Sequence, residues 1–199
     1  MSITYKHKLI GSVSLAAALL VAVSPVWVAQ ALTDTSTVTV AVGSSITVAS
    51  ADSVSFSVTP TAAGSQSSDD DTVTVSTNST AGYTLRISSS DTTNVLTSGG
   101  NTIAASANTY TVPAALTNNT WGYAIAGGNF DASYSVFTNV EGSTTKWAGM
   151  PVLASLQTIK TTATTASNDN TSVWYSAEVN SSQPNGTYTD VVTYTATAN

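Results

Sequence analysis

The sequence contains no cysteine among its 199 residues. Disulfides, thiolate metal sites, a cysteine nucleophile and lipidation of a cysteine are therefore excluded. Its one histidine, His7, lies close to the N-terminus. A chain that loses this segment has no general base of the kind most hydrolases use, and lacks the commonest transition-metal ligand. We therefore expect no enzymatic activity, no metal and no cofactor.

Charged residues are also scarce, at 8% of the chain, against about 25% in an average soluble protein. Serine, threonine, asparagine and alanine take their place. Branched and aromatic side chains such as Thr, Val and Tyr fit the pleated surface of a sheet, whereas Ser, Asn and Gly favour turns. This composition predicts many short strands separated by turns.

The first 31 residues have the order of a secretory signal peptide. Lysines lie within the first eight residues, an apolar run covers residues 9–23, and an Ala29-Gln30-Ala31 site follows Pro25. The run of about 15 residues is shorter than the ~20 that a membrane-spanning helix needs. We therefore expect a signal-peptide helix over residues 1–31, cleaved between Ala31 and Leu32, as the chain's only contact with a membrane.

The remaining residues, 32–199, are acidic. Only Arg86, Lys146 and Lys160 are cationic against all 11 acidic residues, so the formal net charge is −8. Such a surface repels phosphate backbones and anionic lipid headgroups, which argues against nucleic-acid or peripheral membrane binding. An exported protein without cysteine suits an extracellular place, secreted or on a bacterial cell surface.

Two stretches have the alternating apolar pattern and central turn of a β-hairpin, residues 72–90 and 171–199. In the second, Val173, Tyr175, Ala177 and Val179 alternate, with Trp174 on the opposite face. Further alternation predicts strands at residues 35–42, 46–48, 54–58 and 121–125, and weaker ones near Ile103, Tyr110 and Ile159. The polar stretches 61–71 and 161–170 are predicted to be loops.

No segment after Ala31 has the 3.6-residue period of a helix. Many short strands without helical crossovers predict an all-β fold. We expect an antiparallel two-sheet β-sandwich of eight or nine strands, Ig-like or pilin-like. It would form a single domain over residues 32–199, with an elaborated middle segment at about residues 94–170.

A resemblance rests on four runs: DTVTVSTNSTAGYTLRISSS, TWGYAIAG, KWAGMP and VWYSAEVNSSQPNGTYTDVVTYTATAN. Together they resemble small secreted surface proteins of candidate-phylum bacteria. Their order is similar to that of WxL-type cell-wall-binding domains, and the closing run is similar to the end of spore-coat-U-like and archaic chaperone–usher pilins. The chain has Trp121-Gly122-Tyr123 and Trp147-Ala148-Gly149 where WxL domains have Trp-x-Leu, and it lacks the pilins' cysteine pair. The resemblance implies a non-enzymatic surface protein.

Three aromatic residues are candidates for a glycan-binding platform: Trp147, Trp121 and Tyr123. Trp121 and Tyr123 alternate with Ile125, which favours a place in the core, because large aromatic residues dominate cores. Trp147 lies in a glycine-containing stretch before Pro151, so its sequence context is compatible with a site or with the core.

The polar candidates are weaker. Asp69-Asp70-Asp71 matches no calcium loop and is interpreted as a solvated acidic loop. Asp131 and Glu141 are an unsupported acid pair for glycoside hydrolysis. A buried Lys146 or Lys160, with an Asn and Glu141 or Glu178, supplies the residue types for an isopeptide crosslink.

Tyr188 follows the turn Asn185-Gly186-Thr187 and is predicted to lock that hairpin turn to its neighbour by a tyrosine-corner-like hydrogen bond. The strand-like segments at both ends of residues 32–199 are candidates for pairing with another subunit. We therefore expect a structural or adhesive surface protein whose partner is a copy of itself, or, as the alternative, a module that binds cell-wall or host glycans.

Overall fold

The computed structural model describes residues 32–126 and 146–199, and the fold of these residues is all-β. Residues up to Ala41 form a unit separate from Val42–Asn199, and each is described by itself. The predicted signal peptide and its cleavage site after Ala31, together with Asp131 and Glu141, lie outside the described residues. No helix in the two described ranges has the length and apolar character needed to cross a membrane.

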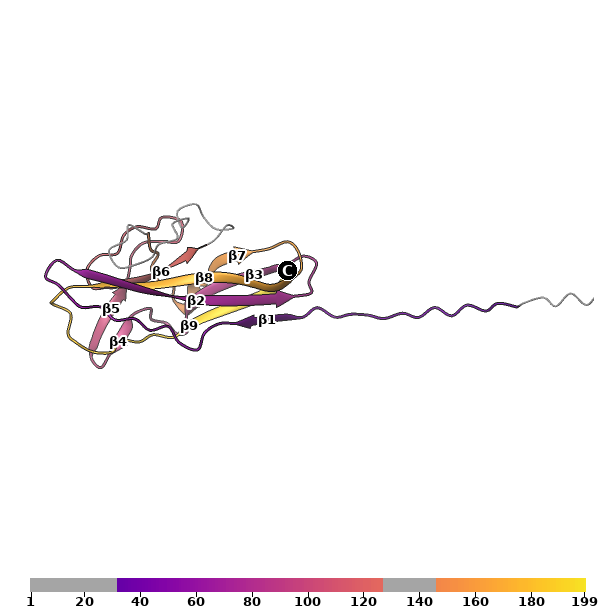
Figure 1. Cartoon of the computed structure of the whole chain (residues 1–199), viewed down its shortest axis with the longest axis horizontal. Helices are drawn as coiled ribbons and strands as arrows, with labels where there is room; N and C mark the ends of the chain where they lie inside the picture. The colour runs from indigo at the N-terminus through magenta and orange to yellow at the C-terminus, as the bar shows by residue number, and fades with distance from the viewer. Residues whose placement is uncertain (1–31, 127–145) are drawn as a thin grey trace, which may run out of the picture. The chain divides into compact units, whose positions relative to one another are not determined.

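Nine strands make up the described part of the Val42–Asn199 unit (Figure 1). They are β1 (Ile46–Ala49), β2 (Ser65–Thr77), β3 (Tyr83–Ser89), β4 (Leu96–Ser98), β5 (Asn101–Ala105), β6 (Thr120–Ala126), β7 (Gln157–Thr161), β8 (Ala166–Val179) and β9 (Val192–Ala198). A short 3-10 turn, η2 (Leu153–Ser155), precedes β7.

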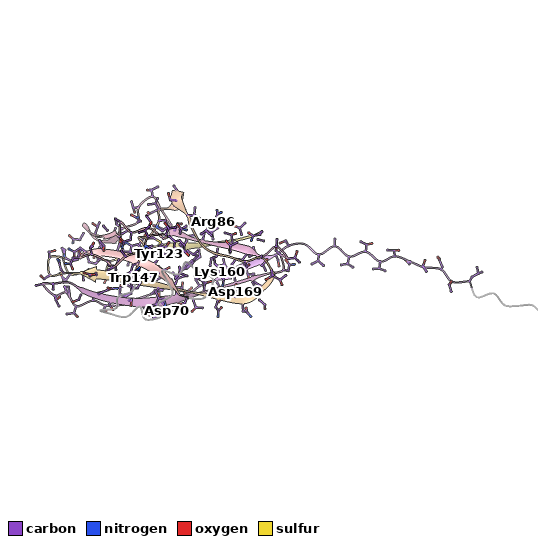
Figure 2. The ribbon with its side chains drawn as sticks, turned by 90° about the horizontal axis from the view of Figure 1, so that it is seen from above. Asp70, Arg86, Tyr123, Trp147, Lys160 and Asp169 are labelled. Carbon is purple, nitrogen blue, oxygen red and sulfur yellow. The ribbon has the colours of Figure 1, made fainter. Side chains whose placement is uncertain are left out.

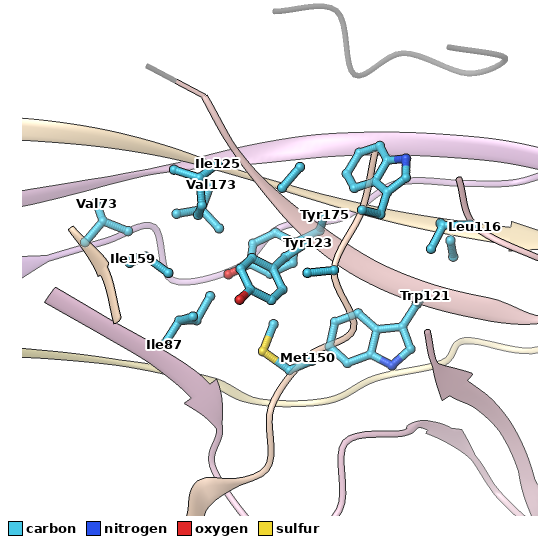
Figure 3. Close-up of a cluster of buried hydrophobic side chains, with 14 of the residues drawn as sticks. Val73, Ile87, Leu116, Trp121, Tyr123, Ile125, Met150, Ile159, Val173 and Tyr175 are labelled. Atoms are coloured by element: carbon cyan, nitrogen blue, oxygen red, sulfur yellow. The ribbon is translucent and has the colours of Figure 1, made fainter. Parts of the chain in front are cut away.

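The strands form two sheets, as expected for a sandwich-like fold. One is six-stranded in the order β1-β2-β8-β6-β5-β4, and the other is three-stranded in the order β7-β3-β9. Pairing is antiparallel except between β5 and β6, which are parallel. One buried hydrophobic cluster draws members from both sheets, including Val73, Ile87, Ile125, Ile159 and Val173 (Figure 3).

Both predicted hairpins are wrong in their pairing. β2 and β8 belong to the six-stranded sheet, whereas β3 and β9 belong to the three-stranded one. Residues 78–82 and 180–191 therefore carry the chain from one sheet to the other. Alternation defines the buried face of each strand, but it does not say which strand lies beside it.

The two long strands also extend further than predicted. β2 begins at Ser65, within the expected loop 61–71, and β8 begins at Ala166, within the expected loop 161–170. They pair with each other from Ser65–Val179 to Thr77–Ala166 and lie side by side in Figure 1. Polar side chains on these extensions are compatible with strands because the long ladder satisfies the main chain.

Two predicted strands lack a ladder. Residues 35–42 and 54–58 have no strand hydrogen bonding in the described structure. Residues 54–58 nevertheless keep the predicted alternation, since Val54, Phe56 and Val58 are half-buried between exposed neighbours. The expected strands around Ile103, Trp121 and Ile159 are confirmed as β5, β6 and β7.

Candidate functional site

A groove of about 860 Å³ opens on the interior face of the six-stranded sheet. Its origin is a difference in strand length. At about 3.3 Å per residue, the 14 residues of β8 span roughly 45 Å, whereas the seven residues of β9 span roughly half that length. Apolar side chains of the six-stranded sheet form the floor of the groove: Leu96, Ile103, Trp121, Tyr175, Ala177 and Val179.

The first wall of the groove is the segment 52–60. Its apolar side chains, Val54, Phe56 and Val58, turn toward the core, and Ser53, Ser55 and Ser57 are exposed. Within the described chain, residues 52–60 make no main-chain hydrogen bond to another segment. The wall is therefore an extended segment with the side-chain pattern of a strand but an unpaired main chain.

Asp71 anchors the start of this wall. The residue is buried in β2, and its Oδ1 accepts a 2.9 Å hydrogen bond from the Ala51 amide. The Tyr175 and Tyr194 hydroxyls hydrogen-bond to each other. The negative charge of Asp71 disfavours the ionised form of both hydroxyls. Burial, reinforced by the charge of Asp71, raises the pKa of both tyrosines, so both hydroxyls stay protonated at neutral pH.

The opposite wall is the loop that joins β8 to β9, and Tyr188 closes it on itself. The Tyr188 hydroxyl donates a 2.7 Å hydrogen bond to the Pro184 carbonyl oxygen and accepts one from Gln183 Nε2 at 2.8 Å. The bond predicted for Tyr188 thus lies within its own turn. That turn joins two sheets rather than two paired strands.

The described N-terminal segment is exposed throughout residues 32–45. Val38, Val40 and Val42 are 84%, 78% and 81% exposed, although their alternation is that of a half-buried strand. Asn78 holds the C-terminal end of this segment. Its Oδ1 accepts from the Ser45 amide at 2.7 Å, and its Nδ2 donates to the Gly43 carbonyl at 2.9 Å. An alternating valine stripe is therefore presented without a cover.

The three aromatic candidates for a glycan platform all lie in the core, as the alternation with Ile125 favours for Trp121 and Tyr123. Trp147 is fully buried, and Trp121 and Tyr123 are 3% and 1% exposed. Trp121 Nε1 donates to the Asn94 carbonyl at 2.9 Å, and the Tyr123 ring stacks on Tyr110 with centroids 6.5 Å apart. Figure 3 shows Tyr123 and Trp121 among the core side chains. A pyranose needs an exposed ring face, which these residues do not offer.

A second polar arrangement links the two sheets. Lys160 of β7 and Asp169 of β8 are labelled in Figure 2, and Lys160 Nζ lies 2.6 Å from Asp169 Oδ1. The Tyr83 hydroxyl of β3 donates to Asp169 Oδ2 at 2.7 Å. The side chain of Lys160 is 5% exposed and that of Asp169 is 32% exposed. Lys160 Nζ also donates to the Asn170 carbonyl at 3.2 Å.

The charges of this cluster reinforce one another. Burial alone would raise the pKa of Asp169, but the hydrogen bonds from Lys160 and Tyr83 and the ammonium charge outweigh it and hold this pKa below its usual value. Burial and the contact with the Asp169 carboxylate raise the pKa of Tyr83. At neutral pH Asp169 is therefore a carboxylate and Tyr83 a neutral phenol.

Of the two carboxylates considered for a crosslink to Lys160, Glu141 lies outside the described residues and Glu178 is wrong. Glu178 lies nine residues beyond Asp169 on β8, which corresponds to about 30 Å along the strand. Lys146 is exposed rather than buried. The Asp69-Asp70-Asp71 run lies in β2 instead of a loop. Among the residues that the structure describes, no three His, Cys, Asp or Glu side chains gather as a metal site would require.

Comparison of the chain with protein-family models, with curated proteins and with solved structures finds no match.

Proposed function

We propose that this chain is a secreted, non-enzymatic structural protein of the bacterial cell surface, and that it assembles with copies of itself by strand addition. The observation that carries the proposal is the uncovered valine stripe Val38, Val40 and Val42. Removing such side chains from water stabilises an assembly by roughly 1.5–3 kcal/mol for each one fully buried.

The segment 52–60 offers a complementary partner. Its apolar residues Val54, Phe56 and Val58 have the same two-residue spacing as the valine stripe, and its main-chain groups have no main-chain partner among residues 32–126 and 146–199. In the proposed contact, residues 35–42 of one copy lie beside residues 52–60 of the next. The added strand would form a hydrogen-bonded ladder and turn its valines toward the groove.

Strand addition also explains why these segments have a strand pattern and no ladder in a single copy. An extended segment of high β-propensity with unpaired N–H and C=O groups is a template for another chain. Each main-chain bond formed contributes about 1 kcal/mol net. Nine extended residues with a shared apolar face thus supply both affinity and register.

The location and the finer fold type belong to the same proposal. The N-terminal segment has the order of a signal peptide, and the acidic chain without cysteine suits an extracellular place. The two-sheet arrangement is compatible with an Ig-like or pilin-like sandwich, in keeping with the resemblance to small secreted surface proteins. The glycan-binding alternative has less support, because its three candidate aromatic residues are buried in the core.

The test compares substitutions on the two faces of one segment. Val40→Asp places a charge on the valine stripe, and Thr39→Asp places the same charge on the opposite face of the alternation. Both positions are exposed, so both full-length variants should fold like the wild type. Light scattering and negative-stain microscopy of the exported protein should show assemblies for wild type and Thr39→Asp, and monomers for Val40→Asp. A monomeric wild type at all concentrations would contradict the proposal.

A further inference from the structure

Lys160 and Asp169 are placed for more than an ion pair. Their nitrogen and oxygen atoms are 2.6 Å apart, with the lysine nearly buried. The two residues lie on strands of different sheets, β7 and β8, so a bond between them would join the two layers. Tyr83 reaches the same carboxylate from β3, which pairs with β7.

We propose that Lys160 and Asp169 condense to an amide, giving a covalent crosslink between the two sheets. The Nζ–Cγ bond forms, one C–O bond of the carboxyl group breaks, and one water leaves. This proposal rests on the cluster alone and is independent of self-assembly.

The protons balance within the cluster. One proton moves from the Lys160 ammonium to Asp169 Oδ1 along their hydrogen bond, which leaves an amine and a carboxylic acid. The amine lone pair attacks Cγ while the Tyr83 hydroxyl hydrogen-bonds the oxygen that gains negative charge, Oδ2. A second proton passes from Nζ to Oδ1, which departs as water, and the third stays on the amide nitrogen.

Two features of the fold favour this reaction. Holding the amine beside the carboxyl group replaces a bimolecular encounter with an intramolecular one, for which effective concentrations reach roughly 10⁵–10⁸ M. The amide is neutral, so its formation removes the cost of keeping a charged lysine out of water.

The product water has a way out. Asp169 is 32% exposed, and it borders a hollow of about 370 Å³ lined by Thr162 and residues 164–170. Lys160, in contrast, is shielded, so its amine faces the carboxyl group rather than solvent. The released water therefore reaches solvent on the side of Asp169.

Mass spectrometry tests the crosslink directly. The full chain is expressed, purified and unfolded in denaturant, its N-terminus is determined, and its intact mass is measured. The expected mass is lower than that of the linear chain by one water. Lys160 is then no substrate for trypsin, so cleavage after this residue is lost, and fragmentation yields a branched peptide joining residues 160 and 169. A wild type of unchanged mass, or a water loss that maps to other residues, would overturn the proposal.

Three variants assign the roles. Asp169→Ala should have the mass of its linear chain and regain cleavage after Lys160. Asn170→Ala should keep the loss of water, because the Asn170 side chain is not the reacting group; a linear mass for this variant would refute the choice of Asp169. Tyr83→Phe should lower the fraction linked in freshly made protein, and an unchanged fraction would remove the hydroxyl from the reaction.

Discussion

The Tyr83 hydroxyl on β3 donates a 2.7 Å hydrogen bond to Oδ2 of Asp169 on β8, and this bond connects the two sheets. The other oxygen of the same carboxylate meets Lys160. One side chain of the six-stranded sheet therefore holds two strands of the smaller sheet. Because Asp169 lies in the half of β8 that the smaller sheet covers, its side chain connects the two layers.

Removing the contacts of the Asp169 side chain should destabilise the fold. Relative to wild-type chains that have not formed the amide, Asp169→Ala leaves the nearly buried Lys160 without its carboxylate partner; loss of one member of a fully buried pair costs about 3–5 kcal/mol, and we expect about 2–3 kcal/mol here because Asp169 is one-third exposed. Tyr83→Phe removes only the hydrogen bond and should cost about 1.5–2 kcal/mol. Urea unfolding of each variant measures both values, and equal effects would show that the hydroxyl alone carries the contact.

The sequence predicts which faces of the strands are buried. Val73 and Val75 in β2, and Val173 and Tyr175 in β8, point into the core as their alternation indicates. It does not predict that β2 pairs with β8 across about 100 residues, because alternation is a local property whereas pairing depends on contacts far along the chain. The turn-like sequences at 78–82 and 180–191 are compatible with a hairpin and equally with a crossing between sheets.

The candidate sites were less accessible to sequence reasoning. Lys160 and Asp169 are nine residues apart, and no motif marks them as partners; they meet only because β7 and β8 lie in opposite sheets. The groove exists because β8 is twice as long as β9. The polar first half of β8 has the composition of a loop, so the sequence does not predict the full length of this strand. The valine stripe is present in the sequence as an alternating pattern, but that pattern predicts a half-buried strand and not the exposure of its valines.

Close packing at glycine gives a second test of the core. A Cβ on Gly122 of β6 would lie 2.3 Å from the Ala148 carbonyl oxygen, a main-chain atom that cannot turn away. Gly122→Ala should therefore cost about 1–3 kcal/mol, as for other overpacked interiors. Gly100→Ala is the matched control, since nothing lies within 4 Å of its added Cβ. Gly122→Ala should have a lower midpoint of thermal unfolding than Gly100→Ala. If the midpoint of Gly122→Ala equals that of the wild type, Ala148 does not lie this close to Gly122.

Asp190 and Asp91 should affect the pH dependence of stability in opposite directions. Burial raises the pKa of Asp190, with the charge of Asp91 adding to it, so the folded state binds this proton more tightly than the unfolded state. Stability therefore falls as pH rises from the unfolded pKa, near 4, through the raised pKa. Asp190→Asn should raise the midpoint of urea unfolding at pH 7 and change it little at pH 3.

Asp91 provides the comparison for this effect. Hydrogen bonds from the Thr93 amide and hydroxyl lower the pKa of Asp91, so its carboxylate stabilises the fold above the unfolded pKa and loses that contribution as pH falls through the lowered one. Asp91→Asn should therefore lower the urea midpoint at pH 7. Shifts of the same sign in both variants would contradict the assignment.

Hydrogen exchange links the groove wall to assembly. Amides of residues 52–60 have no main-chain acceptor in the described chain, so in the monomeric Val40→Asp variant they should exchange at nearly the rate of an unfolded peptide. Amides of residues 172–178 in β8, which lie between β2 and β6, should exchange many orders of magnitude more slowly. In assembled wild type, strand addition would protect alternate amides of residues 52–60 and also those of residues 35–42. Protection of the second segment without the first would move the acceptor to a different edge and reject residues 52–60 as the partner strand.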